Sequence, residues 1–125
     1  MGRERTDRRM SIRITGTGSA LPGRYVTNEE LAGLVDTSDE WIRERTGIGG
    51  RYVSVGETVA ERAARACASA LENSGKEAEQ VELLLTATCS PEEATPCTAC
   101  QVQDKIGAGN AVAFDMTAAC AGFLF

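Results

Sequence analysis

Apolar and polar residues alternate over residues 11–17, where two isoleucines are separated by an arginine. A period of two predicts a β-strand that leads into a turn at Gly16–Gly18. The two glycines resemble the start of a dinucleotide-binding motif, but Leu21 stands where a third glycine is required, and Pro22 would prevent a helix from opening there. We therefore expect these glycines to serve close packing of the backbone.

Two short helices are predicted by Thr-x-x-Glu capping boxes. The box at Thr27 opens the first helix, whose apolar side chains are expected to point inward: Leu31, Leu34 and Val35. The box at Thr37 opens the second, over residues 38–46, and Gly47 ends it.

A third capping box, at Thr58, predicts a longer helix that runs to Asn73 and stops at Gly75. One face of this helix is apolar and the opposite face is polar. The apolar stripe is expected to contain Val59, Ala63, Cys67, Ala70 and Leu71. Its small residues favour close packing on a sheet.

Two apolar runs predict buried strands of a parallel sheet, Val81–Thr88 and Ala111–Met116. Between them, a loop over residues 89–95 leads to a helix with Pro96 at its first position, which ends near Ile106. The order strand, helices, strand, helix, strand predicts an α/β layered fold.

Composition and charge narrow the class of protein. The chain has 125 residues, of which 42% are hydrophobic, so one domain is expected. The net charge of -5 without a basic stripe argues against nucleic acid, and no apolar run is long enough to span a membrane. Residues 1–10 carry four arginines and predict a disordered basic tail before a domain over 11–125. This tail lacks the apolar segment of a secretory signal, so we expect a cytoplasmic protein.

Five cysteines and no histidine limit the chemistry of this chain. A self-contained Cys–His pair and a Cys2His2 metal site are excluded, and no metal is expected. Cys97 and Cys100 have the spacing of a dithiol redox site, although inert packing is the stronger interpretation. Cys67 and Cys89 are interpreted as structural.

Cys120 is the candidate nucleophile. It follows a predicted strand and stands among alanines and Gly122, which permit a sharp turn from strand to helix. A thiol at the start of a helix has a lowered pKa, and backbone N–H groups there can hold an oxyanion. The alternative is a buried structural cysteine.

Thr37, Trp41 and Arg45 are spaced by four residues, which predicts one helical face. An indole and a guanidinium together can enclose a flat heterocycle such as adenine, and the guanidinium can also meet phosphate. The alternative, favoured by the spacing alone, is a tryptophan packed in the core under an arginine.

The sequence resembles β-ketoacyl-acyl-carrier-protein synthase III from about Ser11 to Phe125. The resemblance depends on several blocks, of which the one over residues 36–48 is the most specific. These blocks are Gly16–Pro22, Thr27-Asn28, Asp36–Ile48, Arg51, Ala87-Thr88, Pro96, Ala99–Gln103, Phe114-Asp115 and Ala118–Phe123.

The resemblance implies a thiolase-like fold of two similar α/β halves, usually paired as a homodimer. This chain would supply the N-terminal half only and in incomplete form, consistent with its apolar end, Phe123–Phe125. The family's catalytic histidine and asparagine come from the second half, so the chain is expected to be inactive alone.

The resemblance also implies roles for single residues. Cys120 would take an acyl group from acyl-CoA, and malonyl-acyl-carrier protein would be decarboxylated and condensed onto it. Trp41 and Arg45 would stack on the adenine of coenzyme A, and Thr37 would contact its nucleotide end. Coenzyme A enters as a thioester substrate, and no cofactor is expected. Thr95 would reach the acyl pocket of the partner subunit, where its small size predicts tolerance for primers longer than acetyl.

Three alternatives stay open. The first is a sibling thiolase-fold synthase that makes polyketide or quinolone precursors. The others are a small thiol–disulfide protein that uses Cys97 and Cys100, and a non-catalytic remnant.

Overall fold

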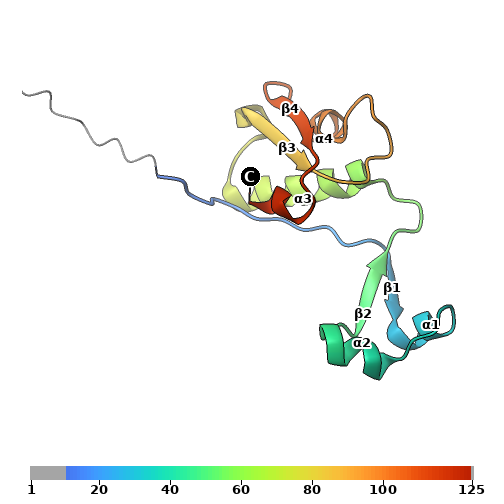
Figure 1. Cartoon of the computed structure of the whole chain (residues 1–125). Helices are drawn as coiled ribbons and strands as arrows, with labels where there is room; N and C mark the ends of the chain where they lie inside the picture. The colour runs from blue at the N-terminus through green and yellow to red at the C-terminus, as the bar shows by residue number, and fades with distance from the viewer. Residues whose placement is uncertain (1–10, 125) are drawn as a thin grey trace, which may run out of the picture.

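The helices and strands of the computed structural model fall into two groups along the chain, which Figure 1 shows as a lower and an upper part. The structure describes residues 11–124. The predicted tail over residues 1–10 and the terminal Phe125 therefore lie outside the described residues.

The lower part is built on two short antiparallel strands, β1 (Arg24–Thr27) and β2 (Gly50–Val53). Tyr25 pairs with Tyr52 in the register, and their rings meet edge to face with centroids 5.1 Å apart. The hydrophobic pattern did not predict this pair. Its signal is the tripeptide Arg-Tyr-Val, which occurs in both strands and combines an aromatic with a β-branched residue.

Two helices complete the lower part, α1 (Asn28–Ala32) and α2 (Asp39–Thr46). The Thr27 hydroxyl accepts a hydrogen bond from Glu30 N, as the first capping box predicts. The N-cap of α2 is Ser38 and not Thr37, because Ser38 Oγ accepts from Trp41 N. The predicted inward direction of Leu34 and Val35 is wrong, since both lie beyond the end of α1 and are exposed.

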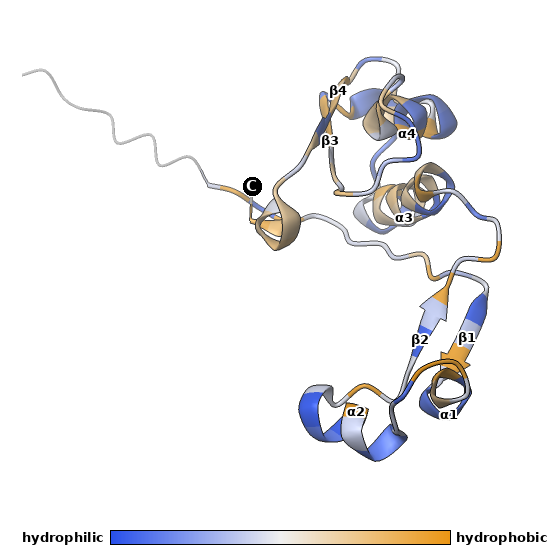
Figure 2. Ribbon diagram, turned by 45° about the vertical axis from the view of Figure 1, so that its right-hand side comes forward, coloured by the Kyte–Doolittle hydropathy of each residue, from blue (hydrophilic) through white to orange (hydrophobic). Residues whose placement is uncertain are grey.

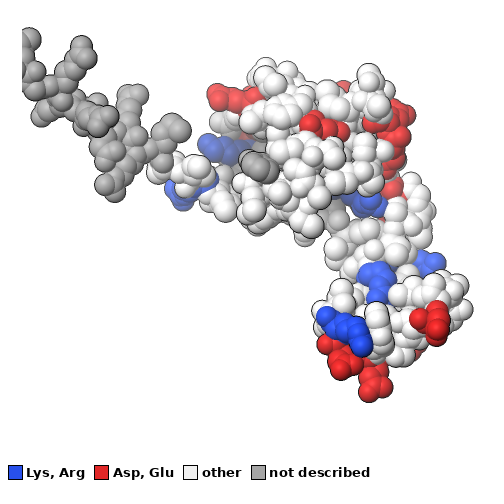
Figure 3. All heavy atoms as spheres, viewed as in Figure 1, with Lys and Arg blue, Asp and Glu red and all other residues white. Residues whose placement is uncertain are grey.

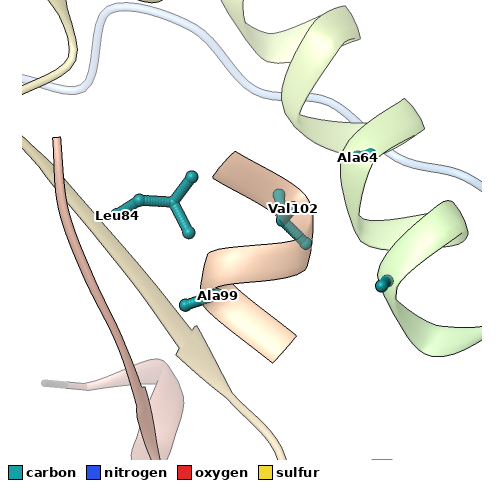
Figure 4. Packing of buried hydrophobic residues seen from close by; sticks show 5 residues of the cluster. Ala64, Leu84, Ala99 and Val102 are labelled. Carbon is teal, nitrogen blue, oxygen red and sulfur yellow. The ribbon is translucent and has the colours of Figure 1, made fainter. Parts of the chain in front are cut away.

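The upper part contains α3 (Val59–Ser74), β3 (Leu83–Ala87), α4 (Thr98–Ile106) and β4 (Val112–Met116), together with the 3-10 turns η1 (Ala78–Gln80) and η2 (Ala119–Phe123). β3 and β4 pair in parallel, which confirms the predicted parallel arrangement. Figure 4 shows α4 between β3 and α3, with Leu84, Ala99, Val102 and Ala64 forming the contacts of these layers.

α3 begins and ends as predicted. Thr58 and Glu61 form the complete capping box, and Gly75 ends the helix in the left-handed conformation at φ 65°. Its most buried residues, however, are Ala60 and Ala64, which the predicted stripe did not include. Ala63 and Cys67 of the predicted stripe do pack against the core cluster, but the centre of the buried face is shifted to Ala60 and Ala64, because α3 packs chiefly on α4.

α4 begins two residues later than Pro96. Its N-cap is Cys97, and its first backbone N–H groups are held from another element. Asp115 of β4 accepts from Thr98 N (2.8 Å) and from Ala99 N (2.6 Å). A carboxylate at the first turn satisfies N–H groups that have no partner within the helix. The start of α4 is therefore set by tertiary contact.

The predicted strand over residues 11–17 does not form. This segment is extended, Ile12 is 97% exposed, and no strand among residues 11–124 pairs with it. The expectation of close backbone packing is confirmed: a Cβ on Gly16 would lie 2.8 Å from Ser74 Cβ, and one on Gly18 would lie 2.5 Å from Ala70 N. Both contacts are with α3.

Only one face of the β3–β4 pair is covered in the part of the chain that the structure describes. Leu84 is buried against α4, whereas Leu83, Val112 and Phe114 are exposed. The prediction that these strands are buried therefore holds for one face only among residues 11–124. None of the described helices is long and apolar enough to cross a membrane.

Candidate active site

Cys120 lies in the turn that follows β4. β4 ends at Met116, and η2 begins at Ala119, whose φ of 45° is in the left-handed region. This conformation is uncommon for a residue with a Cβ and strains the backbone directly before Cys120. The change of direction that presents Cys120 therefore occurs at Ala119.

The Cys120 turn is held against the carboxyl end of β3. Thr88 N donates to Met116 O over 3.1 Å, and Thr117 Oγ1 donates to Thr88 O over 3.4 Å. A Cβ on Gly122 would lie 2.6 Å from Ala87 Cβ, closer than real Cβ contacts. This confirms that the sharp turn depends on a small residue after Cys120.

The Cys120 side chain is exposed, so the alternative of a buried structural cysteine is wrong in this structure. The chain forms a short 3-10 turn, in which Phe123 is 95% exposed. Figure 2 shows this apolar turn near the C label.

Trp41 and Arg45 lie together on α2. The guanidinium carbon of Arg45 is 4.5 Å from the centroid of the Trp41 ring, and Trp41 is 52% exposed. The alternative of a core tryptophan is therefore wrong. Thr37 precedes the N-cap of α2, so it lies outside the helical face that Trp41 and Arg45 share. The arrangement offers an accessible indole and a cation to one ligand.

Asn28 is a site residue that sequence reasoning missed. It is completely buried, and its amide donates to Asp39 Oδ1 and Ile48 O over 2.7 Å each. Its Oδ1 accepts from Arg51 Nη2 over 2.6 Å. These contacts connect α1 and β2 to the first turn of α2. Asn28 and Arg51 both belong to the sequence blocks that resemble synthase III, but nothing in the sequence indicated that their side chains interact.

The ionised carboxylate of Asp39 also helps to hold the N-terminal end of α2. The hydrogen bond from Asn28 and then those from Arg43 hold the pKa of the Asp39 carboxyl below its ordinary value. Arg43 Nε donates to both Asp39 oxygens over 2.8 Å. The ionised carboxylate also lies at the N-terminus of α2, where the helix dipole favours negative charge. α2 is therefore anchored at the end opposite Arg45.

The structure does not bring all predicted site residues together. Figures 1 and 2 show the Cys120 turn in the upper part and α2 in the lower part.

Thr95 is exposed in the loop before α4, and its peptide bond to Pro96 is cis. Lys and Arg are scattered over the face of the molecule in Figure 3, with Asp and Glu between them.

The remaining cysteines differ in exposure. Cys97 and Cys100 are half-buried, with sulfur atoms 3.3 Å apart. Cys67 is half-buried beside the core cluster, and burial raises the pKa of its thiol, as expected of a structural cysteine. Cys89 is exposed, so its structural interpretation is wrong. The described residues contain no cluster of three His, Cys, Asp or Glu side chains able to hold a metal ion.

Comparisons of sequence and of structure with known proteins both find the same family. The chain is 50% identical over 115 residues to β-ketoacyl-[acyl-carrier-protein] synthase III of Clostridium acetobutylicum, covering 92% of this chain and 35% of that protein. The crystal structure of 3-oxoacyl-[acyl-carrier-protein] synthase III from Aquifex aeolicus has a TM-score of 0.86 at 43% identity, with 89% of this chain and 36% of that chain covered.

A polyketide enzyme is equally similar in structure. The priming β-ketosynthase of the R1128 polyketide pathway has a TM-score of 0.86 at 37% identity, over 89% of this chain and 34% of that chain. No protein-family model matches the chain.

These comparisons identify first the fold class of the chain and then its family. The α/β layers of the chain are those of a thiolase-like fold. Within this class, the chain matches the N-terminal portion of β-ketoacyl-acyl-carrier-protein synthase III in both sequence and structure. The chain spans about 35% of the length of the curated relatives it matches.

Proposed function

We propose that the whole protein is a condensing enzyme that starts fatty acid synthesis, with Cys120 as its nucleophile. The observation that carries the proposal is the exposed Cys120 thiol, presented after β4 by the left-handed Ala119. A nucleophile on a strained turn at the carboxyl end of a strand is accessible to substrate while its backbone is held firmly. The similarity to synthase III supports the same assignment.

In the proposed reaction, the Cys120 thiolate attacks the carbonyl carbon of an acyl-CoA thioester. The bond between that carbon and the sulfur of coenzyme A breaks, and coenzyme A leaves as a thiol after protonation. Malonyl-acyl-carrier protein then loses carbon dioxide, and the resulting carbanion attacks the acyl-Cys120 thioester. The products are a 3-oxoacyl-carrier protein and free Cys120, so no cofactor is consumed.

The nucleotide end of coenzyme A is assigned to α2. Trp41 is half exposed, and the guanidinium of Arg45 lies over its ring. Adenine stacks on such a ring, and the guanidinium can bind a phosphate. Thr37, just before the N-cap, would contact the nucleotide from the adjoining loop.

Further features belong to the same proposal. The whole protein would work as a homodimer in the cytoplasm, and Thr95 would border the acyl pocket of the partner subunit. A histidine and an asparagine that assist decarboxylation would come from the sequence that the relatives have beyond this segment.

Since Thr95 is small, the whole protein should accept primers longer than acetyl. Comparing its turnover rates with acetyl-CoA and with a longer acyl-CoA tests this expectation. A strict preference for acetyl-CoA would contradict this point.

Acylation of the whole protein tests the proposal. Incubation with acetyl-CoA without malonyl-acyl-carrier protein should add one acetyl group to Cys120, as read by peptide mass spectrometry. Cys120→Ala should abolish this addition. Cys89→Ala is the matched control, because Cys89 is also exposed and follows the neighbouring strand β3. Unchanged acylation in Cys120→Ala would overturn the assignment.

The second candidate is a priming synthase of a polyketide pathway, favoured by the TM-score of 0.86 to the R1128 enzyme. Both enzymes would acylate Cys120, so the first experiment does not separate them. Condensation rates with malonyl groups on a fatty acid carrier protein and on a polyketide carrier protein would distinguish the two. A preference of tenfold or more for the polyketide carrier would favour this second candidate.

A further inference from the structure

Cys97 and Cys100 form a thiol pair that the proposed reaction does not use. Their sulfur atoms are 3.3 Å apart, within hydrogen-bond distance. Cys97 is the N-cap of α4, and Cys100 lies one turn later on the same face. Both side chains are half-buried, so solvent reaches them without a change in fold.

Cys97 and Cys100 have different hydrogen-bond partners and different charged neighbours. Cys100 Sγ lies 3.9 Å from Ala113 O of β4, which can accept its S–H. The Asp115 carboxylate occupies the backbone N–H groups of Thr98 and Ala99, between the two cysteines. Its negative charge opposes a second negative charge on Cys100. Cys97 is the N-cap of α4 and directly precedes the N–H groups that Asp115 holds.

We propose that Cys97 and Cys100 form a thiol–disulfide exchange site that a low-molecular-weight disulfide oxidises to an intramolecular disulfide. The Cys97 thiolate attacks one sulfur of the disulfide RSSR, and RS⁻ leaves, forming a mixed disulfide on Cys97. Cys100 then loses its proton to RS⁻ and attacks Cys97 Sγ, and the second RS⁻ leaves and takes a proton from solvent. One protein dithiol and one RSSR become one protein disulfide and two RSH.

The order of attack follows from the thiol chemistry. The hydrogen bond to Cys97, burial, and the charges of Cys97 and Asp115 all raise the pKa of the Cys100 thiol. A raised pKa leaves less thiolate, so Cys97 meets the oxidant first and Cys100 resolves the mixed disulfide. The short distance between the sulfurs makes this second step intramolecular and fast.

The reduced full chain, treated with glutathione disulfide and then N-ethylmaleimide, tests the proposal without any acyl substrate. Trypsin would place Cys67, the group Cys89, Cys97 and Cys100, and Cys120 on three separate peptides. The peptide over residues 77–105 should lose two maleimide additions and two hydrogen atoms, with the bond mapped to Cys97 and Cys100. Maleimide on both cysteines, or a lasting glutathione adduct on either, would overturn the proposal.

Three variants sharpen the test. Cys100→Ser should stop at the mixed disulfide on Cys97, whereas Cys97→Ser should leave Cys100 free for maleimide. Cys89→Ser, which removes the exposed cysteine of the same peptide, should form the disulfide as the wild type does. A glutathione adduct on Cys100 in Cys97→Ser that forms as fast as the one on Cys97 in Cys100→Ser would contradict the proposed order. Since the readout is mass alone, failure here leaves the role of Cys120 unaffected.

Discussion

The side-chain nitrogen of Asn28 donates to Asp39 Oδ1 over 2.7 Å, which joins the first residue of α1 to the first residue of α2. Asn28 is completely buried, and the chain between the two residues includes the exposed Leu34 and Val35. The position of α2, and with it that of Trp41 and Arg45, therefore depends on one buried amide more than on apolar packing of the connecting loop.

Asn28→Ala should destabilise the lower part and weaken coenzyme A binding. Removal of the amide breaks its hydrogen bonds with Asp39, Ile48 O and Arg51 in a buried position, at a cost of about 2–4 kcal/mol of unfolding free energy. Urea unfolding measures the stability. In the whole protein, the KM for acyl-CoA should rise with kcat little changed, because the residue positions α2 and does not touch the reacting atoms.

Asn110→Ala is the matched control for Asn28→Ala. Asn110 is exposed and donates a single hydrogen bond, to Glu79 O. Its loss should change the unfolding free energy by less than about 1 kcal/mol. Equal effects of the two substitutions would show that the buried network does not hold α2.

Arg45→Ala should weaken coenzyme A binding about tenfold, since the cation and its stacking contribute about 1 kcal/mol or somewhat more. Arg45→Lys should recover only part of this affinity, because an ammonium lacks the planar group that stacks beside Trp41. Isothermal titration of the whole protein with coenzyme A measures both. Glu40→Ala, an exposed change on the same helix, should leave the affinity unchanged; a similar loss there would remove the special role of Arg45.

Gly18→Ala should destabilise the fold. The new Cβ would lie 2.5 Å from Ala70 N, and the backbone of α3 has to move to admit it. The expected cost is about 1–3 kcal/mol of unfolding free energy, measured by thermal or urea unfolding. Gly109→Ala meets nothing within 4 Å and should be neutral or slightly stabilising. If Gly18→Ala were as stable as Gly109→Ala, the extended segment would not pack on α3.

Glu57 should make stability depend on pH in the acidic range. Hydrogen bonds from Val55 N, from its own backbone, from Gly23 N and from Ser54 lower the pKa of this carboxyl from its ordinary 4.5 to about 2. A lowered folded-state pKa contributes stability above pH 4.5, and this contribution is lost as the pH falls from 4.5 toward 2. Urea unfolding across this window should show the decline.

Glu57→Gln should flatten this decline, because the amide does not titrate. Glu93→Gln, an exposed change in the loop after β3, serves as the control and should retain the wild-type slope. An unchanged slope in Glu57→Gln would contradict the role assigned to this carboxylate.

Local chemistry made several elements predictable. The Thr58 capping box and Gly75 define α3 because their donors and acceptors lie within a few residues of one another. The same reasoning placed α1 and α2 within a residue of their observed starts. Gly16 and Gly18 predicted close packing of their backbone, because such packing requires only that a Cβ is absent.

Other features depended on residues far apart in the chain. The strand expected over residues 11–17 needs a neighbour to accept its hydrogen bonds, and alternation alone does not provide one. α4 starts at Thr98 because a carboxylate from β4 holds its first N–H groups. Pro96 could begin a helix equally well by its own geometry, so the sequence favoured the wrong residue.

The sequence by itself determined the caps of α1 and α3, the parallel strand segments and the candidate nucleophile, because these depend on residue type and short spacing. Tertiary structure decided that Trp41 is exposed beside Arg45, that Ala119 takes a left-handed conformation before Cys120, and that Asn28 holds α2. Exposure, backbone strain and buried hydrogen bonds arise only when distant segments occupy the same space, so a local pattern cannot contain them.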